Sequence, residues 1–300
     1  MAIKRHSRKQ GTRTFRCKNS RGRRSSRIEL NGSSRGGEKA AVDHRITIQR
    51  LPARPLKFRW AEAISAPDWQ IYRRAIIALR EAGIPFMLGG GFALATFTGR
   101  WRDTKDIDFY VHPRDQKKAI GALTQAGFGD YFSTRAYDRQ WIYRATTSGV
   151  IVDTIWAMAN QRAQVDDIWF QRASPIVIRG ENLKVLPMEE FMWCKLYIMQ
   201  RDHCDWTDVF NLLYAVGPRL DWAHLLWRLE EDRPVLKALL IMYAWLCPRT
   251  VRKLPANLWK RLGLQKAAGV RSRQKRDHIR LLDTRRWFAA LQPDTGKLEV

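Results

Sequence analysis

Residues 84–111 are the part of this 300-residue chain that most constrains its fold. A short apolar stretch at 85–88 runs into three successive glycines at 89–91, and an apolar helical pattern follows at 92–98. A second apolar stretch at 106–112 then has the composition of a strand. This order predicts a strand, a tight glycine turn, a helix and a second strand.

The second strand carries two acids on one of its faces. Successive side chains of a strand point to opposite sides, so Asp106, Asp108 and Tyr110 share a face. The other face is wholly apolar and is expected to lie in the core, with Ile107, Phe109 and Val111. Two neighbouring carboxylates repel each other unless a cation lies between them.

The glycine turn lies close to these acids in the predicted order. Without a Cβ, Gly90 and Gly91 would let a polyphosphate approach the backbone, and the helix that follows directs its N–H groups toward that anion. A glycine turn that only tightens the junction is the alternative. With the acids beside it, the turn indicates a site for a metal-bound nucleoside triphosphate, and Mg²⁺ prefers such oxygen ligands.

Asp153 is the third candidate carboxylate. It lies in an apolar strand predicted at 149–156, which pairs with 140–146 in a hairpin around Thr147-Ser148-Gly149. An isolated acid in such a strand is costly without a partner. A metal shared with Asp106 and Asp108 would offset that cost, and so would a local cap or a salt bridge to an arginine.

Basic side chains surround the predicted site in the sequence. Arg102, Thr104 and Lys105 lead into the acid pair, where they would hold phosphates or neutralise the acids. Lys195 lies in an apolar helix, from which it would either reach the triphosphate or extend to solvent. Asp205 and Asp208 have the spacing of a helix N-cap followed by an acidic first turn.

The order of these parts resembles the polymerase-beta-like nucleotidyltransferase superfamily. The matching residues are Gly90, Gly91, Ala93, Arg102, Thr104, Lys105, Asp106, Asp108 and Asp153. The later run at 186–190, with Lys195, Arg201, Asp205 and Asp208, looks like the small bacterial branch that includes abortive-infection and toxin–antitoxin enzymes. Many members carry Gly-Ser where this chain has Gly90-Gly91, so a serine contact to phosphate would be missing.

The resemblance implies transfer of a nucleoside monophosphate from an NTP to an acceptor hydroxyl, with release of pyrophosphate. It implies two Mg²⁺ ions held by Asp106, Asp108 and Asp153, which would also be the catalytic residues. Nucleotide binding would fall to Gly90, Gly91, Arg102, Thr104, Lys105 and Lys195. The alternatives are a catalytically degenerate nucleic-acid-binding protein, an enzyme that modifies an antibiotic or a protein, and a toxin with an antitoxin-like partner.

The charge of the chain favours a polyanionic partner. The net charge is +25, and residues 1–40 alone carry 13 Lys or Arg against 2 acids. RNA, such as tRNA, is therefore the acceptor that composition favours. The four cysteines form no Cys-x-x-Cys pair, and no apolar leader or 20-residue apolar run is present. These features predict a cytoplasmic protein without a membrane span.

We expect an α+β fold with a mixed sheet and flanking helices, followed by a helical domain. The predicted divisions are a disordered basic tail at 1–60, an α/β domain at 61–187, a helical domain at 188–263 and a basic tail at 264–300. Helices are expected at 67–82, 113–127, 159–172, 188–202, 206–216, 221–230 and 233–247. Two further strands are expected at 175–178 and 183–186.

Overall fold

The fold is built on one seven-stranded mixed sheet. The computed structural model describes residues 58–102, 104–200, 203–265 and 278–282. The strand order is β3-β4-β5-β2-β1-β7-β6. The strands are β1 (Phe86–Leu88), β2 (Asp106–Val111), β3 (Gly129–Asp130), β4 (Ile142–Thr147), β5 (Val150–Ile155), β6 (Ser174–Ile178) and β7 (Glu181–Val185). The expected mixed sheet is thereby confirmed.

The central strands bring the sequence-predicted segments side by side. β2 pairs antiparallel with β1 and parallel with β5, while β4 and β5 form the expected antiparallel hairpin. β1 also pairs with β7 in parallel. The start of β2 therefore lies beside both the end of β1, where the glycines follow, and the first half of β5.

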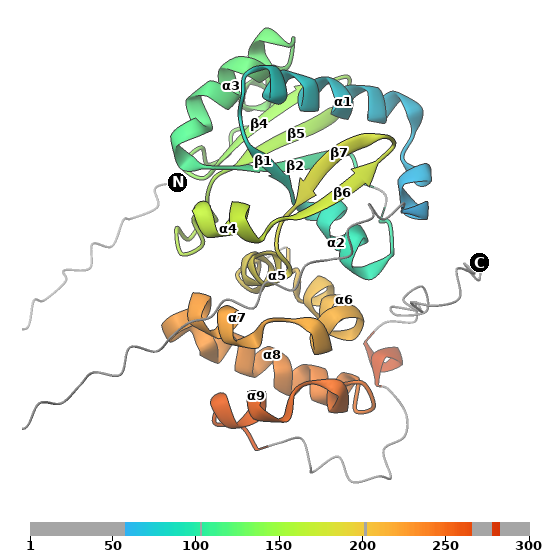
Figure 1. Ribbon diagram of the computed structural model, residues 1–300, viewed down its shortest axis with the longest axis vertical. Coiled ribbons are helices and arrows are strands. Elements are labelled where there is room, and N and C mark those ends of the chain that lie inside the picture. Colours follow the sequence, from blue (N-terminus) through green and yellow to red (C-terminus); the bar gives the residue numbers. More distant parts are fainter. Residues whose placement is uncertain (1–57, 103, 201–202, 266–277, 283–300) are drawn as a thin grey trace, which may run out of the picture. The chain divides into compact units, whose positions relative to one another are not determined.

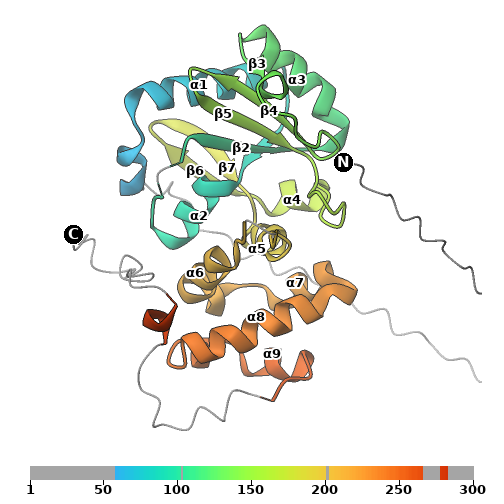
Figure 2. The ribbon, with the colours of Figure 1, turned by 180° about the vertical axis from the view of Figure 1, so that it is seen from behind.

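Helices cover both faces of the sheet (Figures 1 and 2). Two of them, α1 (Ala66–Glu81) and α3 (Gln116–Gln125), lie along one face and contact each other. The opposite face carries α2 (Gly90–Thr98) and α4 (Asp167–Arg172). Ser65 caps α1 by accepting a hydrogen bond from the backbone N–H of Asp68, which satisfies one of the free donors at the helix start.

The chain after β7 is helical, as expected. Its helices are α5 (Met188–Leu196), α6 (Trp206–Val216), α7 (Trp222–Leu229), α8 (Arg233–Leu246) and α9 (Ala256–Arg261). Short 3₁₀ turns join several elements: η1 (Arg59–Ala63), η2 (Pro113–Asp115), η3 (Tyr131–Ser133), η4 (Gly217–Arg219), η5 (Glu230–Asp232), η6 (Val251–Lys253) and η7 (Ile279–Leu281). Helix α6 packs against α2, and α5 packs against both α6 and α7.

The predicted helix at 159–172 is wrong over its first half. Only α4 is helical, because Asp166 caps it by accepting hydrogen bonds from the N–H groups of Ile168 and Trp169. The residues before it form a loop closed by an isolated bridge between Ala157 and Gln164. The helix predicted at 188–202 also ends early, at α5.

The two terminal predictions fall largely beyond the described residues. Residues 1–57 of the expected tail at 1–60 and most of the basic tail at 264–300 lie outside them, as does Arg201. The end of the expected tail is ordered, because Arg59 and Trp60 begin η1. The division between an α/β domain and a helical domain at residue 187 stays a prediction. Within the described chain, no helix is both long and apolar enough to cross a membrane.

The core lies between the sheet and the helices on its two faces. On β2, Ile107, Phe109 and Val111 are fully buried, as strand alternation predicts. The ring of Phe109 packs edge-on against Phe86 of β1. The apolar face of β2 thus anchors the strand, while its other face stays free to carry polar groups.

Replacing Phe109 by Ala is expected to lower the free energy of unfolding by about 3–5 kcal/mol, because a large buried ring is lost and a cavity remains. Urea denaturation measures this change. Phe132→Ala is the matched control, since that ring is 42% exposed and its loss should cost much less. Equal losses in both variants would contradict the placement of Phe109 in the core.

Candidate active site

The glycine turn between β1 and α2 is shaped by side chains of β2. Gly89 precedes the first residue of α2, and its N–H donates to the carbonyl of Asp108 at 2.9 Å. A Cβ on Gly89 would lie 2.2 Å from Cε2 of Tyr110. Gly89 is therefore required at this close approach, a requirement that the sequence pattern did not reveal.

Gly90 and Gly91 make room for the polar residues of the predicted site. Gly90 has a φ of +46°, and a Cβ there would lie 1.7 Å from Oδ2 of Asp108. A Cβ on Gly91 would lie 3.2 Å from Cγ2 of Thr104. The Asp108 carboxylate thus lies directly against the turn at the N-terminus of α2.

The structure brings the three predicted acids together. Asp108 of β2 lies directly opposite Asp153 of β5 in the sheet register, and Asp106 precedes Asp108 by two residues on the same face. Burial raises the pKa of Asp108 well above its usual value, and the charges of Asp106 and Asp153 raise it further. Lys195 and Arg144 act in the opposite direction. The positive charges of Lys195 and Arg144 therefore offset only part of the rise in the pKa of Asp108.

Asp106 is oriented by a residue that precedes β2. The hydroxyl of Thr104 donates a hydrogen bond to Oδ1 of Asp106. Thr104 also lies against Gly91, so it connects the start of β2 to the turn. This position agrees with the predicted role of Thr104 at the site, which stays a prediction.

Asp153 is held by an arginine. Nε of Arg144 donates to Oδ1 of Asp153 at 2.9 Å, and a terminal guanidinium nitrogen donates to Oδ2 at 2.7 Å. Burial raises the pKa of Asp153, and the Arg144 bonds partly offset this rise. The salt bridge to an arginine, one of the partners that the sequence left open for Asp153, is present. The roles of Asp153 as a catalytic residue and as a metal ligand stay predictions.

Lys195 and Arg102 converge on Asp208 of α6. Nζ of Lys195 pairs with Asp205 and lies 3.0 Å from Oδ2 of Asp208, while Arg102 lies 3.1 Å from Oδ1 of Asp208. Burial lowers the pKa of Lys195, but Asp208 and Asp205 more than offset this and the pKa is raised. Lys195 therefore remains charged near Asp108.

Two interpretations of these residues need adjustment. Asp205 occupies the N-cap position of α6, but its side chain makes no capping hydrogen bond and pairs with Lys195 instead. Lys105 is exposed one residue before β2, where strand alternation directs it away from the face of the acids. The structure thus brings Lys195 near Asp108, pairs Arg102 with Asp208 and leaves Lys105 apart, while all three roles in nucleotide binding stay predictions.

The side chains fit a divalent cation at Asp106 and Asp108. These two carboxylates offer hard oxygen ligands, and burial together with the charges of Asp106 and Asp153 raises the pKa of Asp108, a rise that a bound cation would oppose. Over the residues that the structure describes, no group of three or more His, Cys, Asp or Glu side chains is arranged to hold a metal. The predicted three-acid ligand set is therefore not preformed, because Arg144 holds Asp153.

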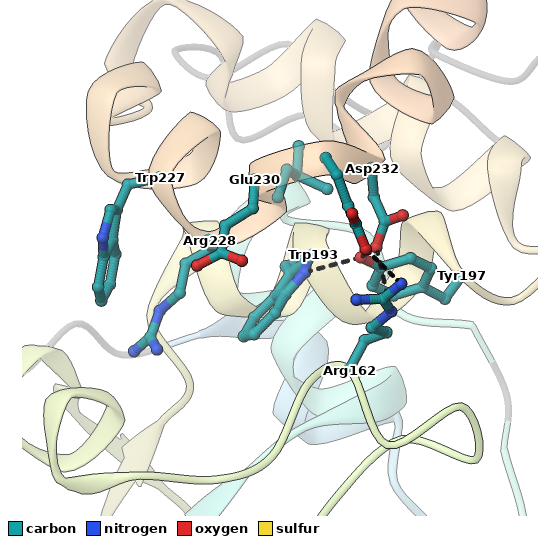
Figure 3. A pocket seen from close by; sticks show the side chains of 9 residues that line it. Arg162, Trp193, Tyr197, Trp227, Arg228, Glu230 and Asp232 are labelled. Carbon is teal, nitrogen blue, oxygen red and sulfur yellow. Dashed lines mark hydrogen bonds and ion pairs between the residues drawn. The ribbon is translucent and has the colours of Figure 1, made fainter. Parts of the chain in front are cut away.

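A separate cavity of about 150 Å³ lies on the side of α5 that carries Trp193 (Figure 3). It is lined by Trp193 and Tyr197 from the α5 region, by residues of α7 and η5, and by Arg162 from the loop before α4. Trp193 and Lys195 are two positions apart on α5 and so point to roughly opposite sides of the helix. None of the predicted site residues lines this cavity.

Gly90→Ala is expected to abolish the stabilisation of the protein by Mg²⁺ and a nucleoside triphosphate, because the added methyl takes the place of Oδ2 of Asp108. A thermal shift with and without both ligands measures the effect. Gly99→Ala is the matched control. Its φ is +72° and nothing lies within 4 Å of the added methyl, so it carries the same backbone strain of about 1–2 kcal/mol alone. Full stabilisation of Gly90→Ala by the ligands would contradict this geometry.

Comparisons with known proteins find distant structural similarity to nucleotide-transferring enzymes and related proteins. No curated protein matches it. Among solved structures, the antibiotic-resistance factor ANT(2'')-Ia is similar at 16% identity and a TM-score of 0.40, covering 60% of this chain and 98% of that one. The lincosamide antibiotic adenylyltransferase LnuA, bound to lincomycin, has 14% identity and a TM-score of 0.35, with coverages of 50% and 94%. JHP933 from Helicobacter pylori has 16% identity and a TM-score of 0.34, with coverages of 67% and 90%.

A family model provides the identification that these structures do not. The model is described as an uncharacterised nucleotidyltransferase, and it matches residues 69–251, more than half of the chain. The matched range includes the glycine turn, the three acids and Lys195. The expectation of a nucleotidyltransferase is thereby confirmed: the chain belongs to this nucleotidyltransferase family.

Proposed function

We propose that this nucleotidyltransferase moves a nucleoside monophosphate from an NTP to a hydroxyl group of RNA, with Mg²⁺ as cofactor and pyrophosphate as the leaving group. The observation that carries the proposal is the position of Asp108. Its half-buried carboxylate lies against Gly90, beside Asp106 and opposite Asp153. A protein that only binds a polyanion has no use for buried acids at the place where the phosphates would lie.

In this proposal, Asp106 and Asp108 hold Mg²⁺, and Thr104 fixes the orientation of Asp106 through its hydroxyl. The bound metal would lower the pKa of the acceptor hydroxyl and stabilise the charge of the departing pyrophosphate. The N–H groups at the start of α2 would bind the triphosphate, since the glycines allow close approach and the helix dipole favours an anion. The protein thus supplies position and charge.

The basic residues complete the charge balance of the site. Lys195 is nearly buried and lowers the pKa of Asp108. Arg102 has a side chain that is 58% exposed, so a nucleotide phosphate could compete with Asp208 for its guanidinium. We propose that both residues favour the bound triphosphate. Lys105, which is exposed, would contribute only through its charge.

RNA is the proposed acceptor because of the charge of the whole chain. The net charge of +25 favours a polyanion over a cationic or neutral small molecule. The charge is highest in residues 1–40, so the terminal segments would supply much of the RNA contact. A cytoplasmic location, which remains a prediction, would place the enzyme with RNA and NTPs.

Asp106→Asn is expected to reduce transfer by at least about 1,000-fold, because an amide is a poor Mg²⁺ ligand and no other side chain replaces the lost charge. The protein is incubated with each α-labelled NTP, Mg²⁺ and total RNA, and the label is then measured in the RNA and protein fractions. We expect label in RNA that depends on Mg²⁺.

Asp167→Asn is the matched control for this experiment. Asp167 is a surface acid whose side chain is 66% exposed, so transfer should remain unchanged. Full transfer by a folded Asp106→Asn protein would contradict the proposed mechanism. Label in protein alone would exclude RNA as the acceptor, and RNA binding without labelling would favour the degenerate binding protein.

A further inference from the structure

Arg144 lies beside the acids Asp106, Asp108 and Asp153, although the sequence did not assign it to the site. It lies on β4, directly opposite Asp153 of β5 in the antiparallel register. Side chains in such a cross-strand pair lie on the same face of the sheet, so the backbone itself places Arg144 beside Asp153. The pair therefore belongs to the sheet and does not depend on a loop.

The contact between the two side chains is two-fold. Both oxygens of Asp153 accept hydrogen bonds from Arg144, at 2.9 and 2.7 Å. The side chain of Asp153 is 3% exposed, whereas that of Arg144 is 34% exposed. The guanidinium thus covers the acid from the solvent side, and it retains its own access to solvent.

The backbone of Arg144 is also fixed from the edge of β4 that faces away from β5. Its N–H donates to the hydroxyl of Tyr137 at 2.9 Å, and that hydroxyl donates to Oδ1 of Asp130 at 3.2 Å. Asp130 also accepts a hydrogen bond from Arg139 at 2.5 Å. This chain of contacts holds the start of the Arg144 side chain in place.

The charge of Arg144 acts on the whole cluster. The acids Asp106, Asp108 and Asp153 all raise its pKa, and Arg144 in turn lowers that of Asp108. A guanidinium does not lose its proton at neutral pH, so Asp153 is released only when Arg144 moves away. Arg144 therefore fills the role for Asp153 that a divalent cation would otherwise fill.

Building on the proposed function, we propose that Arg144 competes with the divalent cation for Asp153. While the ion pair is closed, Asp106 and Asp108 alone hold a metal. When Arg144 turns away, Asp153 joins them. Arg144 is thus a positioning residue that sets how tightly the site binds metal, and it acts through Asp153.

The test measures binding of Mn²⁺ alone, without nucleotide, by electron paramagnetic resonance on the full chain. Arg144→Gln frees Asp153 and should tighten Mn²⁺ binding roughly 10- to 100-fold, the usual range of coupling between two binding events. In an Asp153→Asn background, the same substitution should change Mn²⁺ binding little, because the acid that Arg144 releases is absent. This double-mutant cycle isolates the competition.

Arg139→Gln is the matched control for charge. It removes one positive charge from a neighbouring arginine that pairs with Asp130 and does not touch Asp153. Equal tightening in Arg139→Gln and Arg144→Gln would overturn the proposal, as would unchanged Mn²⁺ binding in Arg144→Gln. If Arg144→Gln does not fold, Arg144→Lys keeps the charge but not the two-bond contact, and should still tighten Mn²⁺ binding by a smaller factor.

The Asp106→Asn variant distinguishes a failure of this proposal from a failure of the proposed function. Loss of Mn²⁺ binding in Asp106→Asn, with no effect of Arg144→Gln, overturns the competition and leaves the metal site intact. Unchanged Mn²⁺ binding in Asp106→Asn overturns the metal site itself, and with it the proposed function.

Discussion

The structure depends on packing acidic side chains against the glycine turn, where the backbone carries no side chains. Asp108 lies where a Cβ of Gly90 would be, and the neighbouring acids Asp106 and Asp153 are close enough to raise its pKa. Such an arrangement is unfavourable for the fold alone, because burial and like charge both oppose ionisation. It becomes favourable when cations share the site. The surrounding elements supply part of that charge, through Arg144 from β4 and Lys195 from α5.

The helical part of the chain takes part in this balance. Lys195 pairs with Asp205 and Asp208, and Asp208 also binds Arg102 from the segment before β2. One acid of α6 therefore connects a lysine of α5 to an arginine of the segment before β2. This network explains why a lysine can be buried next to the sheet and still carry its charge.

Much of the site could be predicted from local rules. Strand alternation placed Asp106 and Asp108 on one face, and the apolar strand around Asp153 identified it as a buried acid that needs a partner. The partner itself could have been found, because a hairpin that turns at Ser148 and Gly149 places Arg144 opposite Asp153. The role of Gly89 could not, since it depends on the position of the Tyr110 ring from another strand. The start of α4 was missed for a different reason: the cap at Asp166 overrides a helical pattern that extends further back.

The most direct test of the account compares wild type with Asp108→Asn by thermal unfolding, with and without Mg²⁺. Because the pKa of Asp108 is raised above 3.8 in the fold, its ionised form destabilises the metal-free protein. Without Mg²⁺, Asp108→Asn should therefore be the more stable protein, and its advantage should grow as the pH rises above 3.8 until Asp108 ionises in the fold. Mg²⁺ should stabilise the wild type and leave Asp108→Asn unchanged. Equal stabilisation of both proteins by Mg²⁺, or a less stable metal-free Asp108→Asn at neutral pH, would contradict the account.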